Sequence, residues 1–206
     1  MIKVESAYNT DAVPGAADAA LVLEEDLELQ PLDAEYVARN LVRPYMGNSQ
    51  QLVGSKWGRI TCSIENAGFG SAGPASPLAG YDALLRSGGL QRAITPGTAV
   101  DYSPVSTGFE SVPVYWYQDG TFHKLTGAVA ENIRWRYEVG QIPRIVFDLV
   151  GIYNTPQDVA LPTPNTSGWQ TPLIVNADNT PGFALHGASP CLQSLEISLG
   201  NQVARR

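Results

Sequence analysis

Alternating apolar and polar positions near the middle of the chain predict the centre of the fold. Residues 112–117 form an apolar run that ends at Asp119-Gly120, a dipeptide typical of tight β-hairpin turns. Residues 122–125 follow as the return strand, and apolar side chains then occupy every second position in 133–139 and in 145–149. We therefore expect a four-stranded antiparallel meander. Because both faces of its first strand are apolar, a helix or a neighbouring subunit should cover the face that the core does not.

Further strands and one helix are predicted around this meander. Residues 57–65 and 194–199 alternate between apolar and polar side chains, as half-buried strands do. Apolar residues recur at helical spacing from 78 to 85. Ser76-Pro77 suits the N-cap and the first helical position, and Gly88-Gly89 suits the end of the helix. A helix of about three turns is long enough to cover one face of a sheet.

The chain is predicted to form one mainly β domain, 1–206, built from antiparallel strands and long loops. Its 206 residues suit a single all-β domain and are enough to bury a hydrophobic core. Three segments lack a clear strand or helix pattern: a loop or flexible N-terminal arm (1–19), a glycine-rich loop (66–76) and a proline-rich loop (154–170). Long loops in compact domains are usually functional or lie at interfaces.

The sequence is acidic, with a formal net charge of −7. A chain of this kind lacks the cationic stripe with which proteins grip nucleic acid. The first 35 residues hold nine aspartates and glutamates against Lys3 alone, and the strand pattern of 20–29 breaks at Glu25-Asp26, as at a β-bulge. This acidic stretch is either a solvated face, or a subunit contact or channel lining.

The same sequence favours a reducing compartment. Cys62 and Cys191 are the two cysteines, and we expect them to be two buried free thiols rather than a disulfide. The chain does not open on the apolar stretch of a signal peptide, and no run is long enough to span a membrane. We therefore expect synthesis in a cytoplasm, solubility there and no membrane partner.

Catalytic, metal and cofactor motifs are not evident. Residues 68–73 match G-x-G-x-x-G, but Pro74 and Pro77 separate them from the helix, and the preceding strand alternates, which argues against a dinucleotide site. His123 and His186 are too few and wrongly spaced for a zinc site. The G-x-S-x-G elbow of serine hydrolases does not occur. We expect no enzyme activity, no metal and no cofactor.

Two other classes of protein remain open at this point. The aromatic residues of 115–117, together with Trp135 and Tyr137, could stack on a sugar in a carbohydrate-binding β-sandwich module, although aromatics at strand spacing are more often core or subunit contacts. Carboxylates dispersed over several strands could form a hydrolase site. A monomer that binds glycans would support the first class, and turnover abolished by one carboxylate substitution would support the second.

Several blocks of the sequence occur in an order and spacing shared with one family. In one-letter code they are NLVRPYMGNS (40–49), YSPVSTGFESV (102–112), YQDG (117–120) with HKLTGA (123–128), and GQIP (140–143). From about residue 20 to its end, the chain resembles the tail tube proteins of long, non-contractile-tailed bacteriophages of the siphovirus type and their prophages.

This resemblance implies an antiparallel β-sandwich of two sheets with one flanking α-helix and long loops. It implies a structural virion protein, made in the bacterial cytoplasm, whose copies form six-membered rings that stack into a tube for DNA ejection. The expected partners are further copies of the chain and the tape measure, tail terminator and distal tail proteins, with DNA passing without sequence-specific binding. Acidic walls suit such a conduit, because like charge repels DNA and keeps it moving.

The resemblance also suggests roles for particular residues. The polar faces of two predicted strands would line the lumen, and the acidic stretch would meet arginines of a neighbour. The candidate lumen residues are Arg59, Thr61, Ser63, Glu65, Ser194, Glu196 and Ser198. The candidate subunit-interface residues are Glu24, Glu25, Asp26, Glu28, Arg39, Arg43, Tyr115 and Tyr117.

Overall fold

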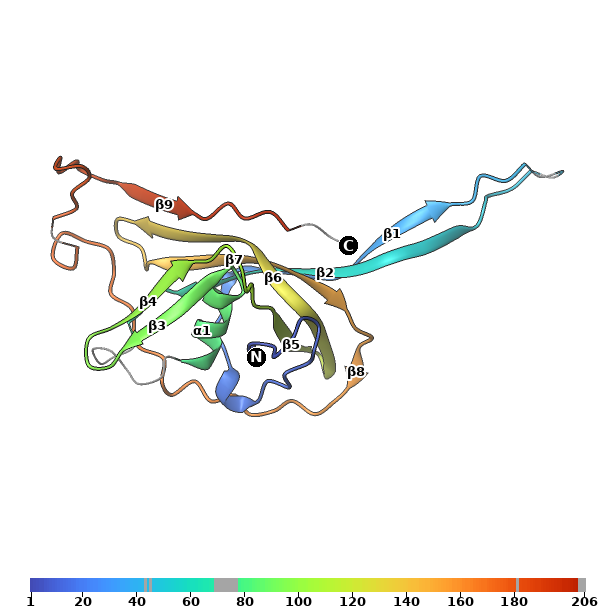
Figure 1. The fold of residues 1–206 in the computed structure, drawn as a ribbon, viewed down its shortest axis with the longest axis horizontal. Helices are drawn as coiled ribbons and strands as arrows, with labels where there is room; N and C mark the ends of the chain where they lie inside the picture. The colour runs from blue at the N-terminus through green and yellow to red at the C-terminus, as the bar shows by residue number, and fades with distance from the viewer. Residues whose placement is uncertain (43, 45, 69–77, 181, 204–206) are drawn as a thin grey trace.

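The computed structural model describes residues 1–42, 44, 46–68, 78–180 and 182–203. Within these residues the chain is mainly β, with two antiparallel sheets and one α-helix, as predicted (Figure 1). A short 3-10 helix spans Ala16–Asp18, and α1 spans Ala79–Arg86. The strands are β1 (Leu23–Ala38), β2 (Gln51–Glu65), β3 (Leu90–Thr95), β4 (Ala99–Pro104), β5 (Val112–Gln118), β6 (Thr121–Glu138), β7 (Arg144–Tyr153), β8 (Gln157–Asp158) and β9 (Ser194–Ser198).

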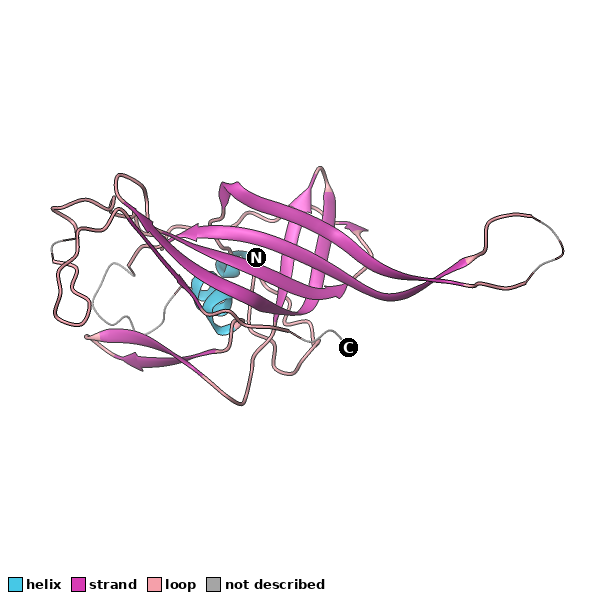
Figure 2. Cartoon of the chain, turned by 90° about the horizontal axis from the view of Figure 1, so that it is seen from above, coloured by secondary structure: helices cyan, strands magenta, loops and turns pink. Residues whose placement is uncertain are grey.

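The larger sheet contains seven strands, and β6 is its central member. The strand order is β1-β2-β7-β6-β5, and β8 and β9 also pair with β6. The long strand β6 pairs with β5 through residues 121–128 and with β9 through residues 134–138. The smaller sheet is the β3–β4 hairpin. Figure 2 shows the long strands of the larger sheet crossing the molecule side by side.

The hydrophobic core lies between α1 and one face of the larger sheet. Every second residue is buried there over 60–64 of β2 and 145–149 of β7, because successive side chains of a strand point to opposite faces. These residues join Leu84 and Leu85 of α1 in a single cluster. The strand residues are Ile60, Cys62, Ile64, Ile145, Phe147 and Leu149. The residues that alternate with these buried ones in β2 and β7 therefore lie on the opposite face of the sheet.

The predicted four-stranded meander is wrong in one respect, because residues 121–138 form one long strand instead of two. Two bulges interrupt the pairing of β6 with β7, between Thr126 and Val129 and between Ala130 and Asn132. Gly127 lies within the first bulge with φ of 59°, a conformation that glycine adopts most easily. A bulge bends a strand without ending it. The predicted Asp119-Gly120 turn is confirmed.

The predicted helix is confirmed over Ala79–Arg86, whereas its predicted N-cap, Ser76-Pro77, lies outside the described residues. Most of the glycine-rich loop, 66–76, lies outside them as well. The helix ends before Gly88-Gly89, as expected. A Cβ atom on Gly88 would lie 2.2 Å from Cδ1 of Ile133, so the close approach of this turn to β6 requires glycine.

A buried carboxylate ties α1 to the β3–β4 hairpin. The side chain of Asp82 is 7% exposed and accepts hydrogen bonds from Arg86 at 3.2 Å, from Arg92 at 2.7 Å and from the hydroxyl of Tyr102 at 2.8 Å. Arg86 also forms an ion pair with Glu110. Burial and the hydrogen bond to Asp82 raise the pKa of Tyr102, which keeps its hydroxyl protonated as a donor. The helix and the smaller sheet therefore share one polar anchor.

The N-terminal segment packs against β5, although the sequence suggested a loop or flexible arm. Ile2 is buried in the core and forms an isolated antiparallel bridge with Val114. Further along the segment, Asp11 accepts a hydrogen bond of 2.5 Å from the hydroxyl of Tyr115. Since neighbouring residues of a strand point to opposite faces, the segment contacts side chains of β5 on both sides. Because both faces of β5 are apolar, each face needs to be covered. The N-terminal segment of the same chain supplies part of that cover.

A second buried carboxylate, that of Glu5, fixes this segment to β6. Glu5 is 7% exposed and accepts hydrogen bonds from the hydroxyl of Ser111 at 2.5 Å and from the backbone N–H of Gly127 at 2.8 Å. The backbone N–H of Asn9 donates to the same carboxylate at 2.8 Å. A charged acceptor that satisfies several buried donors is costly to remove.

The two cysteines are free, as predicted, but the expectation that both are buried is wrong for Cys191, so the two should differ sharply in reactivity. Cys62 lies in the core, where burial raises its pKa to about 12, whereas Cys191 is exposed. Because the thiolate is the reactive form, we expect one thiol to react with a chromogenic disulfide reagent at pH 8 in the native protein and two in denaturant. Cys191→Ser should abolish the native reaction, whereas a Cys62→Ser variant that keeps the fold should preserve it. Two thiols that react equally fast in the native protein would contradict this assignment.

Candidate assembly surfaces

The face of the larger sheet opposite the core carries many polar side chains and is called here the polar face, although Ser63 and Val146 on it are buried, at 0% and 2% exposed. Directly opposed residues of neighbouring antiparallel strands lie on the same face, and the register aligns them in rows across β2, β7, β6 and β9. One row is Ser63, Val146, Arg134 and Ser198, and the next is Glu65, Arg144, Arg136 and Glu196. The structure thus brings the candidate lumen residues together on this face: Arg59, Thr61, Ser63, Glu65, Ser194, Glu196 and Ser198.

Ion pairs connect the strands of the polar face. Each arginine of this face contacts a carboxylate at 2.9 Å, in the pairs Arg59–Glu131, Arg134–Asp148, Arg136–Glu196 and Arg144–Asp26. The hydroxyls of Thr61 and Ser63 donate to Asp148 and Asp26 at 3.0 and 2.8 Å. Partly exposed pairs of this kind contribute only about 0–1 kcal/mol each. Their larger effect is on the charge that the face presents, since each guanidinium is matched by an anion.

Three glutamates add negative charge to the polar face. Glu28 lies opposite Thr61 in the β1–β2 register, Glu65 is the last residue of β2 and Glu138 is the last of β6. Within the described part of the chain, none of the three forms an ion pair. The polar face therefore combines neutralised cations with surplus carboxylates, an arrangement that repels a polyanion.

The acidic residues proposed for a subunit interface are divided between two environments. Glu25 and Asp26 contact Arg144 of the same chain, at 3.5 and 2.9 Å. Glu24 and Glu28 are exposed. The sequence could not reveal the contact with Arg144, because that residue lies more than a hundred positions away and reaches β1 across β2.

The remaining interface candidates lie elsewhere in the fold. Arg39 donates a hydrogen bond to the side chain of Gln50 at 3.2 Å, at the turn end of the β1–β2 hairpin, and Arg43 lies outside the described residues. Tyr115 is 8% exposed and bound to Asp11, whereas Tyr117 is half-buried. Little of Tyr115 is therefore available to a neighbouring molecule.

Strands β1 and β2 continue beyond the body of the protein as a long hairpin, which sequence reasoning missed (Figures 1 and 2). Their pairing extends to Ala38 and Gln51, far outside the predicted strands at 20–29 and 57–65. The outer part of the hairpin exposes many large apolar side chains. These are Tyr36, Val37, Leu41, Val42, Met46, Leu52 and Val53. Exposed apolar clusters usually mark interaction surfaces. In the sequence, the apolar residues on both sides of the turn were the signal from which this hairpin could have been predicted.

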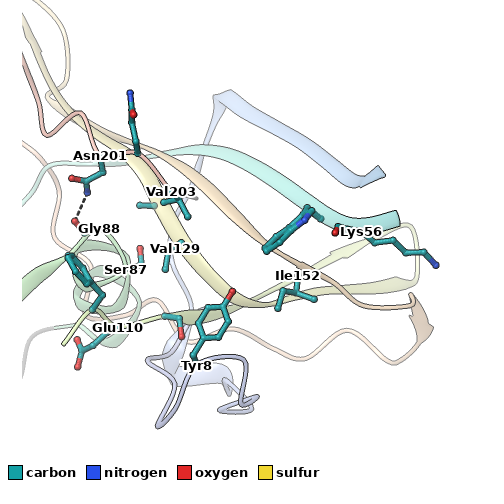
Figure 3. Close-up of a pocket in the computed structure, with 16 residues that line it drawn as sticks. Tyr8, Lys56, Ser87, Gly88, Glu110, Val129, Ile152, Asn201 and Val203 are labelled. Atoms are coloured by element: carbon teal, nitrogen blue, oxygen red, sulfur yellow. Dashed lines mark hydrogen bonds between the residues drawn. The ribbon is translucent and has the colours of Figure 1, made fainter. Parts of the chain in front are cut away.

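A mainly apolar cavity of about 760 Å³ lies where β2, β6 and β7 meet the end of α1 and the C-terminal segment (Figure 3). Ile152 of β7 lines it, together with Tyr8 and Phe109, which are 62% and 67% exposed. The side-chain amide of Asn201 donates to the carbonyl of Gly88 at 2.7 Å and holds the C-terminal segment beside the cavity. The exposure of these two aromatic rings shows that a single chain does not completely bury the apolar cavity.

The aromatic residues that suggested sugar binding do not form an exposed platform. Tyr115 is buried, and Trp116 and Trp135 pack against the hydrophobic core. The ring of Trp116 also stacks on His123, with 5.1 Å between centroids. In the described residues, no cluster of three or more His, Cys, Asp and Glu side chains could hold a metal ion. The helices of this part of the chain are too short or too polar to cross a membrane.

Comparison with known proteins identifies a family whose members assemble, which is consistent with the exposed apolar surfaces. A family model described as phage tail tube protein matches residues 1–206. Curated proteins gave no match. The family is one of structural virion proteins that assemble into the tail, consistent with exposed apolar surfaces and with a non-enzymatic role. The match covers the whole chain, and this chain therefore belongs to the phage tail tube protein family.

Proposed function

We propose that six copies of this chain form a ring, that the rings stack into a siphovirus-type tail tube, and that DNA passes through its lumen during ejection into the host cell. The polar face lines that lumen. The observation that supports this assignment most strongly is the pairing of its arginines with carboxylates, beside glutamates that lack an ion-pair partner among the described residues.

The charge of the wall determines how strongly DNA would bind to it. Each unpaired cation that contacts a phosphate releases a counterion and strengthens binding, so a cationic lumen would hold the DNA in place. Arginines already matched by carboxylates offer little of this attraction, and the surplus carboxylates repel phosphate. The hydroxyl and carboxylate groups still keep the wall hydrated, which suits passage without sequence-specific contacts.

The sheet edges supply the proposed contacts within a ring. In the described structure, β1 pairs only with β2, and β9 pairs only with β6, so both strands have a free edge. Free edges can pair with another chain. Head-to-tail pairing of unlike edges closes a ring when the rotation between copies matches the ring number. The tape measure, tail terminator and distal tail proteins are the expected further partners, and assembly in the host cytoplasm is expected to precede incorporation into the virion.

A charge-reversal experiment tests the position of the polar face. In tubes of the triple variant Glu28→Lys, Glu65→Lys and Glu138→Lys, we expect short linear duplex DNA to be held inside and protected from nuclease. Wild-type tubes should protect about tenfold less, because the described arginines of the polar face are already paired with carboxylates. The measurement is the fraction of labelled DNA that sediments with the tubes after nuclease digestion.

The matched control places the same added charge elsewhere. Asp101, Asp158 and Asp178 are exposed positions outside the polar face, and their triple lysine variant should bind DNA only where nuclease can reach it. Equal protection by the two triple variants would contradict a lumenal polar face, and so would polar-face variant tubes that protect no more DNA than wild type.

A further inference from the structure

Among the described residues, three strands of the larger sheet with at least five residues pair with only one other strand each, namely β1, β5 and β9. The outer edge of such a strand can pair with another chain through its main-chain N–H and C=O groups. The proposed ring needs two unlike edges on each copy, which β1 and β9 supply. A free edge on β5 would therefore permit contacts that do not belong to the ring.

The outer edge of β5 is covered by residues 1–11, called here the edge guard. Ile2 forms an isolated antiparallel bridge with Val114. The main-chain N–H of Tyr115 donates to the carbonyl of Met1 at 2.9 Å, and the nitrogen of Met1 donates to the carbonyl of Tyr115 at 2.8 Å. Figure 1 shows the N-terminus beside β5. The edge guard thus occupies groups through which a further strand would pair.

Two further features reduce pairing at the same edge. The N–H of Glu5 donates to the carbonyl of Ser111, just before β5, at 2.9 Å. Since alternate residues of a strand direct their main-chain groups to the same side, Pro113 faces this edge together with Ser111 and Tyr115. Proline has no N–H to donate and is typical of strand edges that do not pair. The sequence of β5 and its cover therefore both disfavour an additional strand.

The edge guard does not replace one free edge with another. The N–H of Ile2 donates to the carbonyl of Asp18 at 2.8 Å, and Asp18 belongs to the short 3-10 helix Ala16–Asp18. The pairing of Ile2 with β5 is an isolated bridge and not a long strand. Very short edge strands that are covered by other segments offer little to a partner chain.

Side-chain contacts hold the edge guard in place. Besides the buried carboxylate of Glu5, Asp11 accepts hydrogen bonds from the hydroxyl of Tyr115 at 2.5 Å and from the ammonium group of Lys124 at 2.9 Å. Ile2 adds an apolar anchor that is 3% exposed. Replacing the two carboxylates should therefore loosen the edge guard while the apolar residues of the core remain unchanged.

We propose that the edge guard is an autoinhibitory strand, which closes the β5 edge to other copies and so restricts strand pairing between copies to β1 and β9. The part that concerns β1 and β9 rests on the proposed function. The partner that it excludes is an extended strand of a second copy, because every copy carries the same edges. A matching peptide supplied in trans should pair with a vacated β5 edge in the same way.

A synthetic peptide of residues 1–11, labelled at its C-terminal end, tests this proposal on the full-length chain. In the double variant Glu5→Ala and Asp11→Ala, the edge guard leaves β5 more often, so the peptide should bind at least tenfold more tightly than it binds wild type. Fluorescence anisotropy measures the affinity. The matched control is Glu24→Ala with Asp101→Ala, two exposed acids away from β5, which should bind the peptide as wild type does.

Near-UV circular dichroism shows whether the double variant keeps the native fold. If it does not, the single variant Asp11→Ala takes its place, with an expected gain in affinity of at least threefold. A folded variant that binds the peptide no better than wild type would overturn the proposal. Equal binding of a peptide with the same residues in scrambled order would overturn it as well.

Electron microscopy and sedimentation of the same variants separate this inference from the proposed function. The folded variant should form irregular aggregates, and excess peptide should lower the amount of protein in them at least threefold. Aggregates that the peptide does not reduce would contradict the autoinhibitory role. Peptide binding by chains that form neither rings nor tubes would support the edge guard and count against the tube, whereas regular tubes without any gain in peptide binding would do the reverse.

Discussion

Replacing Asp82 with alanine should lower the free energy of unfolding by about 3–5 kcal/mol. The carboxylate is almost fully buried and receives two guanidinium groups and the Tyr102 hydroxyl. Its removal would leave Arg86 and Arg92 close together with one fewer anion between them, and it would detach α1 from the β3–β4 hairpin. Chemical denaturation of the purified protein, followed by tryptophan fluorescence, measures the change.

Two further variants give this prediction its controls. Asp82→Asn keeps the size of the side chain and an acceptor for Tyr102, so its loss of stability should lie between those of wild type and Asp82→Ala. Asp101→Ala, at an exposed position of β4, should change the free energy of unfolding by less than about 0.5 kcal/mol. The anchor role would be wrong if Asp82→Ala proved as stable as Asp101→Ala.

Replacing Glu5 with alanine should release the N-terminal segment and lower the free energy of unfolding by about 2–4 kcal/mol. The change strands the buried N–H of Gly127 and the hydroxyl of Ser111, and an unsatisfied buried group costs about 1–3 kcal/mol. Hydrogen exchange gives a local readout. The amide of Gly127 should exchange at least tenfold faster in the variant than in wild type.

The control for Glu5 is an acid in the exposed part of the chain. Glu24→Ala removes a carboxylate from an exposed position of β1 and should leave both the stability and the exchange rate of Gly127 unchanged. If Glu5→Ala matched Glu24→Ala in both measurements, the buried carboxylate would not be what fixes the segment.

The strands of the core were predictable because their signal is local. Residues 57–65 alternate strictly, and the same parity that buries Ile60 and Ile64 places Arg59 and Glu65 on the polar face. The turn at Asp119-Gly120 was predictable for a related reason, since its two residues have positive φ values of 47° and 77°, as a type I′ turn requires. The grouping of the candidate lumen residues on one face follows from these local patterns and the register between strands.

The features that sequence reasoning missed depend on distant contacts. The continuity of β6 through Gly127 depends on its pairing with β7, which makes a bulge out of what looked like a break between strands. The attachment of the N-terminal segment depends on Glu5 meeting Ser111 across more than a hundred residues of sequence. The outer β1–β2 hairpin was missed because its side chains are exposed on both faces and therefore do not alternate with a core.

Negative-stain electron microscopy of the purified protein, over a range of protein and salt concentrations, shows directly whether the chain assembles into a tube. We expect rings that show six subunits end-on and hollow tubes with a regular annular repeat at high protein concentration. Screening of exposed ion pairs by salt should change the assembly only modestly, because apolar burial and strand pairing are its main sources of stability. Uniform small particles of monomer size under all of these conditions would contradict assembly of the chain into rings and tubes.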